Sequence, residues 1–283
     1  MQRALIRRPS PRLAEGLVTH IERQPVDVAL AMRQWESYVA ALHDAGWTTI
    51  EVPPLDDCPD SAFVEDTMVV YGDIAVIARA GAGERRPEAA AAAETVATHG
   101  YRTVPITAPG TLDGGDVLKI GPTIYVGQGG RTNAEGINQL RAALTTPPTT
   151  PATQTPPAAH TPPTAPAAPA APVGAVGGVE VRAVPVRKVL HLKSAVTALP
   201  DGTVIGYEPL VDDLGVFDSF RAVPEEAGAH VVLLDDDRLL MAASAPKSAE
   251  LFATLGYTPI VVDISEFEKL EGCVTCLSVR LRG

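Results

Sequence analysis

Short apolar runs separated by turn residues recur along the chain. Four pairs of runs flank a turn of glycine, proline or aspartate, and such pairs predict β-hairpins. The predicted pairs are 67–71 with 74–78, 117–120 with 123–126, 194–199 with 203–207, and 230–234 with 238–242. The last run, 277–281, is expected to pair with the first, 4–8, which leaves no orphan edge.

Stretches with helical periodicity follow most of these hairpins. Residues 27–44 place apolar side chains from Val28 to Leu42 on one face, and Gly46 follows as a stop signal. Further helices are predicted at 87–99, 134–144 and 247–255.

A glycine–aromatic pair opens the strand after a helix three times, at Gly46-Trp47, Gly100-Tyr101 and Gly256-Tyr257. Recurrence of one supersecondary pattern is the mark of a repeat architecture. We therefore predict an α/β fold of five ββαβ-type units in a ring. The alternative is a generic α/β sandwich in which the recurrences are coincidental.

Residues 145–178 interrupt this pattern. From 145 to 172 the chain is almost wholly Thr, Pro, Ala and Gln, and it contains no Asp, Glu, Lys or Arg. Such a segment cannot bury enough apolar area to fold. We expect a single domain, 1–283, with a disordered insertion at 145–178. An interdomain linker is the alternative, although repeat units continue on both sides.

Charge and composition narrow the classes of function. The 283 residues carry a formal charge of −11, which disfavours nucleic acid and anionic membranes as partners. No apolar run approaches a membrane span, and residues 1–13 lack the apolar region of a signal peptide. Three cysteines do not form a disulfide scaffold, so we expect reduced thiols and a cytoplasmic protein.

Reactive side chains stand just before the first strand of several units. Glu65-Asp66, Asp113 with Asp116, His191 and Cys276 precede the runs at 67, 117, 194 and 277. If the units are equivalent, these groups converge. A thiol, a base and carboxylates in one cleft suit nucleophilic attack on a cationic carbon.

Each group also has a simpler interpretation. Cys276 could be a small buried hydrophobe, or could pair with Cys273 in a Cys-x-x-Cys redox or metal site. The redox interpretation is disfavoured because redox cysteine pairs start a helix, whereas a predicted strand follows Cys276. The metal interpretation is disfavoured because structural zinc needs about four ligands. His191, between leucines, could be a core histidine, and the acidic clusters could be surface turns.

Two arginines precede helices. Arg85 and Arg131 could each clamp a substrate carboxylate through two hydrogen bonds, or could be solvated charges. Two adjacent carboxylates on a strand point to opposite faces, so Glu65 and Asp66 face one pocket only if the chain turns there. The glycines of Asp113-Gly114-Gly115-Asp116 allow a close backbone approach or positive φ.

Taken together, these motifs resemble the dimethylarginine dimethylaminohydrolase family of the guanidine-modifying pentein superfamily. The resemblance covers nearly the whole chain apart from the insertion. It rests on residues 63–66, 85–86, 112–118, 131–133, 190–194 and 272–279. It implies a five-bladed α/β propeller, the pentein fold, around a pseudo-fivefold axis, in agreement with the predicted ring.

The resemblance also implies roles. Cys276 matches the nucleophile, His191 the general acid and base, and Asp113 the acidic third member. Asp66 matches a carboxylate that binds the guanidinium group. The remaining substrate-binding matches, at the amino-acid end and the lid, are Leu17, Asp60, Glu65, Arg85, Arg131 and Leu270.

The expected activity is hydrolysis of asymmetric dimethylarginine or monomethylarginine to citrulline through a thiouronium on cysteine, with no metal or other cofactor. Its partner is a small cationic guanidino amino acid, and a homodimer is compatible with the sequence. Two alternatives stay open: an arginine deiminase that releases ammonia, and a non-catalytic arginine-analogue binder or thiol sensor.

Overall fold

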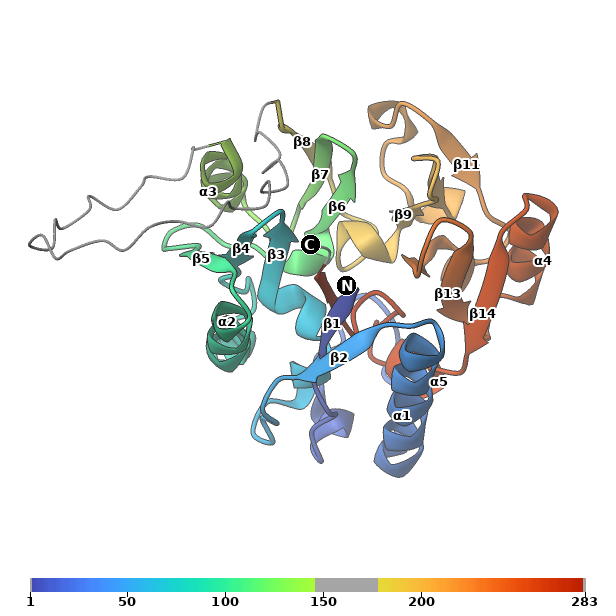
Figure 1. Cartoon of the computed structure of the whole chain (residues 1–283), viewed down its shortest axis with the longest axis horizontal. Coiled ribbons are helices and arrows are strands. Elements are labelled where there is room, and N and C mark those ends of the chain that lie inside the picture. The colour runs from blue at the N-terminus through green and yellow to red at the C-terminus, as the bar shows by residue number, and fades with distance from the viewer. Residues whose placement is uncertain (1, 146–177, 282–283) are drawn as a thin grey trace, which may run out of the picture.

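The structure, a computed structural model, describes residues 2–145 and 178–281. Within these residues the strands form five three-stranded sheets. Figure 1 shows the sheets arranged around a common centre, with helices on the outside.

All five sheets have the same topology. The inner strand is antiparallel to the middle strand, and the middle strand is parallel to the outer strand. The inner strands β3, β6, β9, β12 and β15 all contribute to the lining of one central cavity. From inner to outer strand, the sheets are β15 (Val279–Leu281), β1 (Arg3–Ile6) and β2 (Thr48–Glu51); β3 (Met68–Tyr71), β4 (Ile74–Ile77) and β5 (Arg102–Pro105); β6 (Val117–Ile120), β7 (Thr123–Gln128) and β8 (Glu180–Pro185); β9 (Val196–Ala198), β10 (Val204–Gly206) and β11 (Phe220–Ala222); β12 (Val231–Leu233), β13 (Arg238–Ala242) and β14 (Thr258–Val262). The four predicted hairpins and the pairing of the chain's last strand with its first are confirmed.

Four of the five units carry the predicted helix between the middle and outer strands. These helices are α1 (Val28–Asp44), α2 (Glu88–Thr98), α3 (Ala134–Thr145) and α4 (Pro246–Thr254). The unit of β9, β10 and β11 has two 3₁₀ turns instead, Glu208–Leu210 and Leu214–Val216. Pro209 and Gly215 lie in this connection, and both residues disfavour a helix interior. The short helix α5 (Ser265–Glu268) lies between β14 and β15.

The recurring glycine–aromatic pair has a physical explanation. Gly46, Gly100 and Gly256 each follow a helix and have φ values of 85°, 91° and 91°. Glycine is the residue that adopts this left-handed conformation without strain, so it ends the helix and turns the chain into the outer strand.

The apolar core is divided among the contacts between neighbouring sheets. One cluster joins β3 and β4 to β6 and β7 through Val69, Ile74, Val117 and Ile124. Similar clusters join each next pair of sheets around the molecule. The cluster that contains Ala4 and Leu240 joins the unit of β1 to that of β13 and so closes the ring. The five-bladed propeller is therefore confirmed, and a sandwich of two continuous sheets is not formed.

The predicted insertion at 145–178 lies outside the described residues except at its two ends. Thr145 is the last residue of α3, and Gly178 precedes β8 with φ of 93°. No helix in the described ranges combines the length and apolar character that crossing a bilayer requires.

Candidate active site

Tight turns precede the inner strands and carry the candidate side chains. The 3₁₀ turns Val64–Thr67, Gly114–Asp116 and Leu192–Ser194 lead into β3, β6 and β9, and residues 273–276 turn before β15. Because the inner strands surround one axis, these turns meet at one end of the ring. The carboxylates, the imidazole and the thiol thus come from four different units.

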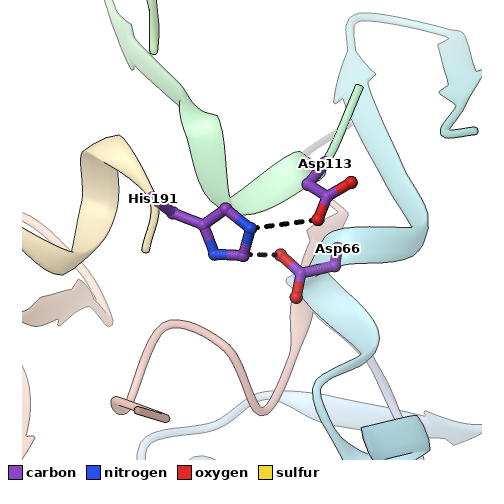
Figure 2. Close-up of side chains that lie close together, drawn as sticks. All are labelled: Asp66, Asp113 and His191. Carbon is purple, nitrogen blue, oxygen red and sulfur yellow. Dashed lines mark hydrogen bonds and ion pairs between the residues drawn. The ribbon is translucent and has the colours of Figure 1, made fainter. Parts of the chain in front are cut away.

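His191 lies between two carboxylates. Its Nε2 atom is 3.0 Å from Oδ2 of Asp113, and its Nδ1 atom is 3.8 Å from Oδ1 of Asp66 (Figure 2). Burial alone would lower the pKa of His191, but Asp66, Asp113 and Asp116 outweigh it and raise this pKa to about 9. At neutral pH the imidazole is therefore charged and can give up a proton.

The loop from Asp113 to Asp116 holds this arrangement in place. Oδ1 of Asp113 accepts a hydrogen bond from the Gly81 amide at 2.9 Å, which leaves Oδ2 for His191. Oδ1 of Asp116 accepts from the Leu192 amide at 2.9 Å and so fixes the residue after His191. Burial raises the pKa of Asp116 to about 6, although His191 and two hydrogen bonds oppose this rise.

Gly115 is needed for a close approach rather than for positive φ. Its amide donates to Oδ1 of Asp66 at 2.9 Å. A Cβ atom at this position would lie 2.6 Å from that oxygen and 2.7 Å from Nδ1 of His191. Any larger residue must therefore displace one of the two reactive side chains.

Asp66 is held by Arg85, and Arg85 is held by Glu88. Nη1 of Arg85 lies 2.7 Å from Oδ2 of Asp66, while its Nε and Nη2 atoms both donate to the Glu88 carboxylate. All three side chains are buried. Burial alone would raise the pKa of Asp66, but His191 and Arg85 lower it to about 2.

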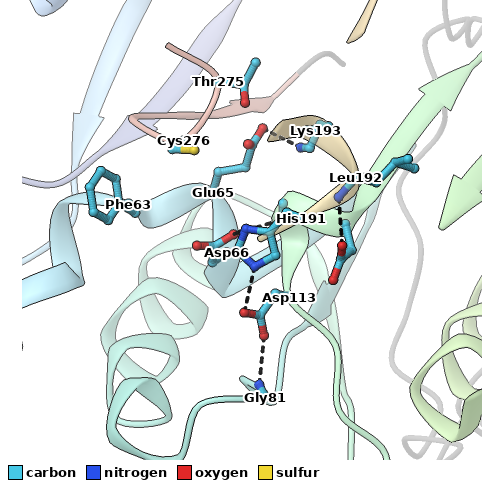
Figure 3. Close-up of polar contacts among 12 residues, drawn as sticks. Phe63, Glu65, Asp66, Gly81, Asp113, His191, Leu192, Lys193, Thr275 and Cys276 are labelled. Carbon is cyan, nitrogen blue, oxygen red and sulfur yellow. Dashed lines mark hydrogen bonds and ion pairs between the residues drawn. The ribbon is translucent and has the colours of Figure 1, made fainter. Parts of the chain in front are cut away.

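Cys276 reaches the same place from the C-terminal unit. Its carbonyl oxygen accepts a hydrogen bond from the Glu65 amide at 3.1 Å, which ties its turn to the turn of Asp66. Figure 3 shows the thiol of Cys276 and the ring of His191 projecting from separate units toward the Glu65–Asp66 turn. The hydrogen bond with Cys273, burial, and the negative charges of Glu65 and Asp66 all raise the pKa of Cys276. These groups therefore favour the protonated thiol of Cys276.

A narrow cavity of about 10 Å³ joins these groups to the N-terminal segment. Cys276, His191, Asp66 and Arg85 line it. The rest of its wall comprises Leu17, Asp60, Phe63, Arg131, Leu190, Leu270, Glu271 and Gly272. The Leu17 amide donates to both carboxylate oxygens of Asp60 at 3.1–3.2 Å, which seats the segment over the cavity.

Arg131 brings a buried donor to this wall. Its side chain is 9% exposed, and its Nη1 atom has no hydrogen-bond partner among the described residues. A buried charged donor without a partner is costly, so this atom is available to pair with an anionic group.

Two relatives of this chain carry the same name. A protein from Streptomyces coelicolor named N(G),N(G)-dimethylarginine dimethylaminohydrolase is 60% identical over 281 residues, 99% of this chain and 97% of its own. One of the same name from Pseudomonas aeruginosa is 32% identical and covers 98% of both chains.

The chain belongs to the dimethylarginine dimethylaminohydrolase family. The structure of a cysteine-to-serine mutant of the Pseudomonas aeruginosa enzyme complexed with citrulline matches with a TM-score of 0.81 at 30% identity, over 99% of this chain and 98% of that one. The N-terminal domain of ArgZ, an arginine dihydrolase, has a TM-score of 0.79 at 17% identity, which shows a shared fold. No protein-family model matches the chain.

Eight of the ten residues predicted for a dimethylarginine dimethylaminohydrolase site line the one cavity, and two lie outside it. Asp113 is hydrogen-bonded to the imidazole of His191 and lies outside the cavity lining. Glu65 points away from Asp66 although the chain turns there, because successive side chains of a 3₁₀ turn project about 120° apart. Its Oε1 atom lies 2.6 Å from both Nζ of Lys193 and Nη2 of Arg280.

Sequence reasoning missed several residues that support the site. Glu88 was unassigned, although its position three residues after Arg85 is the spacing of a helical ion pair. Glu271 was also missed. Its carboxylate accepts from the Thr19 and His20 amides, both at 2.7 Å, and holds the segment that follows Leu17. No local sequence signal marks this second contact.

Three of the site residues have the composition of a metal site. Asp66, Asp113 and His191 offer ligand atoms that lie within 4.8 Å of one another. The carboxylates, however, already stabilise a proton on the imidazole, with a pKa of about 9. A metal ion would have to displace that proton, so the cluster suits proton transfer better than metal binding.

Proposed function

We propose that this protein hydrolyses the guanidinium C–N bond of asymmetric dimethylarginine or monomethylarginine. The products are citrulline and dimethylamine or methylamine. Cys276 is the nucleophile, His191 the general acid and base, and Asp113 the residue that orients and charges His191. The substrate is a small cationic guanidino amino acid.

The observation that carries this proposal is the content of the cavity. One wall holds a thiol beside a charged imidazole and a carboxylate. Another wall holds the unpartnered Nη1 atom of Arg131. The first set suits a guanidinium carbon, and the second suits the carboxylate of an amino acid. The family, and the relative's complex with citrulline, agree with this assignment.

Binding of the substrate prepares the thiol. The pKa of Cys276 is raised partly by the negative charges of Glu65 and Asp66. A guanidinium ion beside Asp66 offsets these charges, so Cys276 ionises more readily in the complex than in the free enzyme. The carboxylate also fixes the orientation of the guanidinium plane toward the sulfur.

The reaction then proceeds in two halves. The thiolate of Cys276 adds to the guanidinium carbon, and His191 gives its proton to the dimethylamine nitrogen as the C–N bond breaks. This leaves a thiouronium on sulfur and a neutral imidazole. His191 next takes a proton from water, the resulting hydroxide attacks the same carbon, and the C–S bond breaks to give citrulline and the free cysteine.

The test is a citrulline assay across dimethylarginine, monomethylarginine, arginine and agmatine. We expect product from the methylated arginines. Turnover of agmatine, which lacks the carboxylate, should be weak because Arg131 stays unpaired. Cys276→Ala should bind substrate without turning it over. Faster release of ammonia from arginine than of amine from methylarginines would assign a deiminase instead, and no turnover of any substrate would favour a binder.

Location and assembly are parts of the same proposal. The acidic charge and the absence of an apolar span in the sequence support a cytoplasmic enzyme that binds neither nucleic acid nor membrane. A homodimer and a single domain over 1–283 remain predictions, which sedimentation and limited proteolysis would test.

A further inference from the structure

Cys273 is a buried thiol that the proposed reaction does not use. Its Sγ atom lies 3.4 Å from Sγ of Cys276, and its side chain also contacts the hydroxyl of Thr275 at 3.3 Å. Cys276 lines the cavity of the candidate active site, whereas Cys273 does not. The arrangement places a second buried sulfur within reach of the nucleophile and outside the cavity lining.

The backbone is already folded for a bond between these two sulfurs. The Cys276 amide donates to the Cys273 carbonyl at 3.0 Å, which closes a four-residue turn. Such turns keep their end Cα atoms within about 7 Å, and disulfides need about 4.4–6.8 Å. The sulfurs must approach by roughly 1.4 Å to reach a disulfide length near 2.05 Å. Rotation of the two side chains can supply that movement.

The two thiols share protons unequally. The hydrogen bond from Cys276 lowers the pKa of Cys273 to about 5, against the effect of burial, while the same contact raises that of Cys276. The two thiols are coupled, so a proton on one sulfur favours the thiolate form of the other.

We propose that Cys273 and Cys276 form a thiol–disulfide modification site, at which a hydroperoxide oxidises Cys276 and Cys273 closes the disulfide. The disulfide removes the nucleophile and so switches the enzyme off. A dithiol reductant restores both thiols and the activity. This inference goes beyond the proposed function, and formation of the disulfide does not depend on it.

The chemistry balances in two steps. Cys276 passes its proton to Cys273, with which it shares a hydrogen bond, and attacks one peroxide oxygen as a thiolate. The O–O bond breaks, and the sulfur becomes a sulfenic acid while hydroxide (or alkoxide) leaves. The thiol of Cys273 then attacks that sulfur, the S–O bond breaks, and the proton of Cys273 leaves with the hydroxyl group as water. The two sulfurs lose two electrons in total, and the peroxide gains them.

The position of Cys273 also protects the nucleophile. A sulfenic acid without a neighbouring thiol is oxidised further to sulfinic acid, which reductants do not reverse. Attack by Cys273 competes with that step. Cys58, the third cysteine, is buried in a different turn and has no sulfur contact among the described residues, so it is a matched control.

The experiment oxidises the full-length enzyme with hydrogen peroxide, blocks remaining thiols with an alkylating agent, and digests with trypsin. Cleavage after Lys269 and Arg280 places both cysteines in one peptide, apart from Cys58. We expect this peptide to lose two hydrogen atoms and take no alkyl group, and dithiothreitol to restore most of the activity. Cys276 as a sulfinic acid with Cys273 still alkylated would overturn the proposal.

Variants supply the second readout. Cys273→Ser should be inactivated by peroxide, regain little activity with dithiothreitol, and carry a sulfinic acid at Cys276. Cys58→Ala should recover like the natural sequence. Equal recovery of Cys273→Ser would refute the protective role. Peptide mapping of the natural sequence decides the disulfide even if Cys273→Ser fails to fold, and even if the untreated enzyme makes no citrulline.

Discussion

Replacing Asp113 by asparagine tests how the site charges His191. Asp113 accepts a hydrogen bond from Nε2 at 3.0 Å and is fully buried, so its carboxylate acts on the imidazole with little screening. The pKa of His191 is about 9 against 6.5 in the absence of the protein environment. That difference of about 2.5 pH units corresponds to roughly 3 kcal/mol in favour of the charged ring.

Asp113→Asn leaves Asp66 and Asp116 to support the charge. A nearby opposite charge shifts a pKa by about 1–3 units, so we expect the pKa of His191 to fall by at least about one unit. The assay is an NMR titration of the labelled imidazole, assigned with His191→Asn. Asp218→Asn is the control, because that carboxylate is on the surface and pairs with Arg182. An unchanged pKa in Asp113→Asn, or a natural value below 6.5, would refute this account of the site.

The same titration has a consequence for stability. The pKa of His191 is higher in the folded than in the unfolded chain, so its contribution is complete below pH 6.5 and is lost as pH rises toward 9. We expect the free energy of unfolding to fall by roughly 3 kcal/mol across this window, and by less in Asp113→Asn. Urea unfolding at pH 6 and pH 9.5 measures both. Gly115→Ala should reduce turnover about a hundredfold, because the added Cβ displaces His191. Gly83→Ala is the control and should keep full turnover, because a Cβ there meets nothing within 4 Å. Equal activity of the two variants would contradict the packing argument. Arg131→Lys should raise KM for methylarginines about 10- to 100-fold and leave the weak turnover of agmatine unchanged, and an equal effect on both would remove the carboxylate contact.

The fold was predictable because each repeat carries local signals. Turn residues mark every hairpin, and a glycine with positive φ ends three of the helices. The two 3₁₀ turns that replace a helix before β11 were not predicted, because such short turns have no clear hydrophobic periodicity. Closure of the ring depended on the pairing of 277–281 with 4–8, which no local pattern requires.

The position of the site in the fold was predictable, but the orientation of its side chains was less so. Placement before the inner strands located Asp66, Asp113, His191 and Cys276, since equivalent turns meet at one end of the ring. The divergence of Glu65 from Asp66 depends on a 3₁₀ turn and on the distant partners Lys193 and Arg280. Contacts of this kind link residues far apart in sequence and become visible only in the folded chain.

The pair Cys273 and Cys276 was only partly predictable from the sequence. Their spacing was visible in the sequence, but spacing alone did not separate a redox pair from a nucleophile with a bystander. The structure places Cys276 in the cavity wall and the sulfur of Cys273 3.4 Å from it, outside the lining. Catalysis and oxidation can therefore share one residue.

The central claim is that the sulfur of Cys276 carries the substrate carbon during turnover. The direct measurement is mass spectrometry of His191→Asn enzyme, mixed with S-methylthiocitrulline, acid-quenched and digested with trypsin. The methanethiolate of this substrate leaves without a proton from His191, so the first half-reaction still proceeds. Without a base to activate water, the thiouronium should accumulate on Cys276, in the peptide that ends at Arg280. Citrulline production by the natural sequence with no adduct on that peptide, or with the adduct on another residue, would contradict the mechanism.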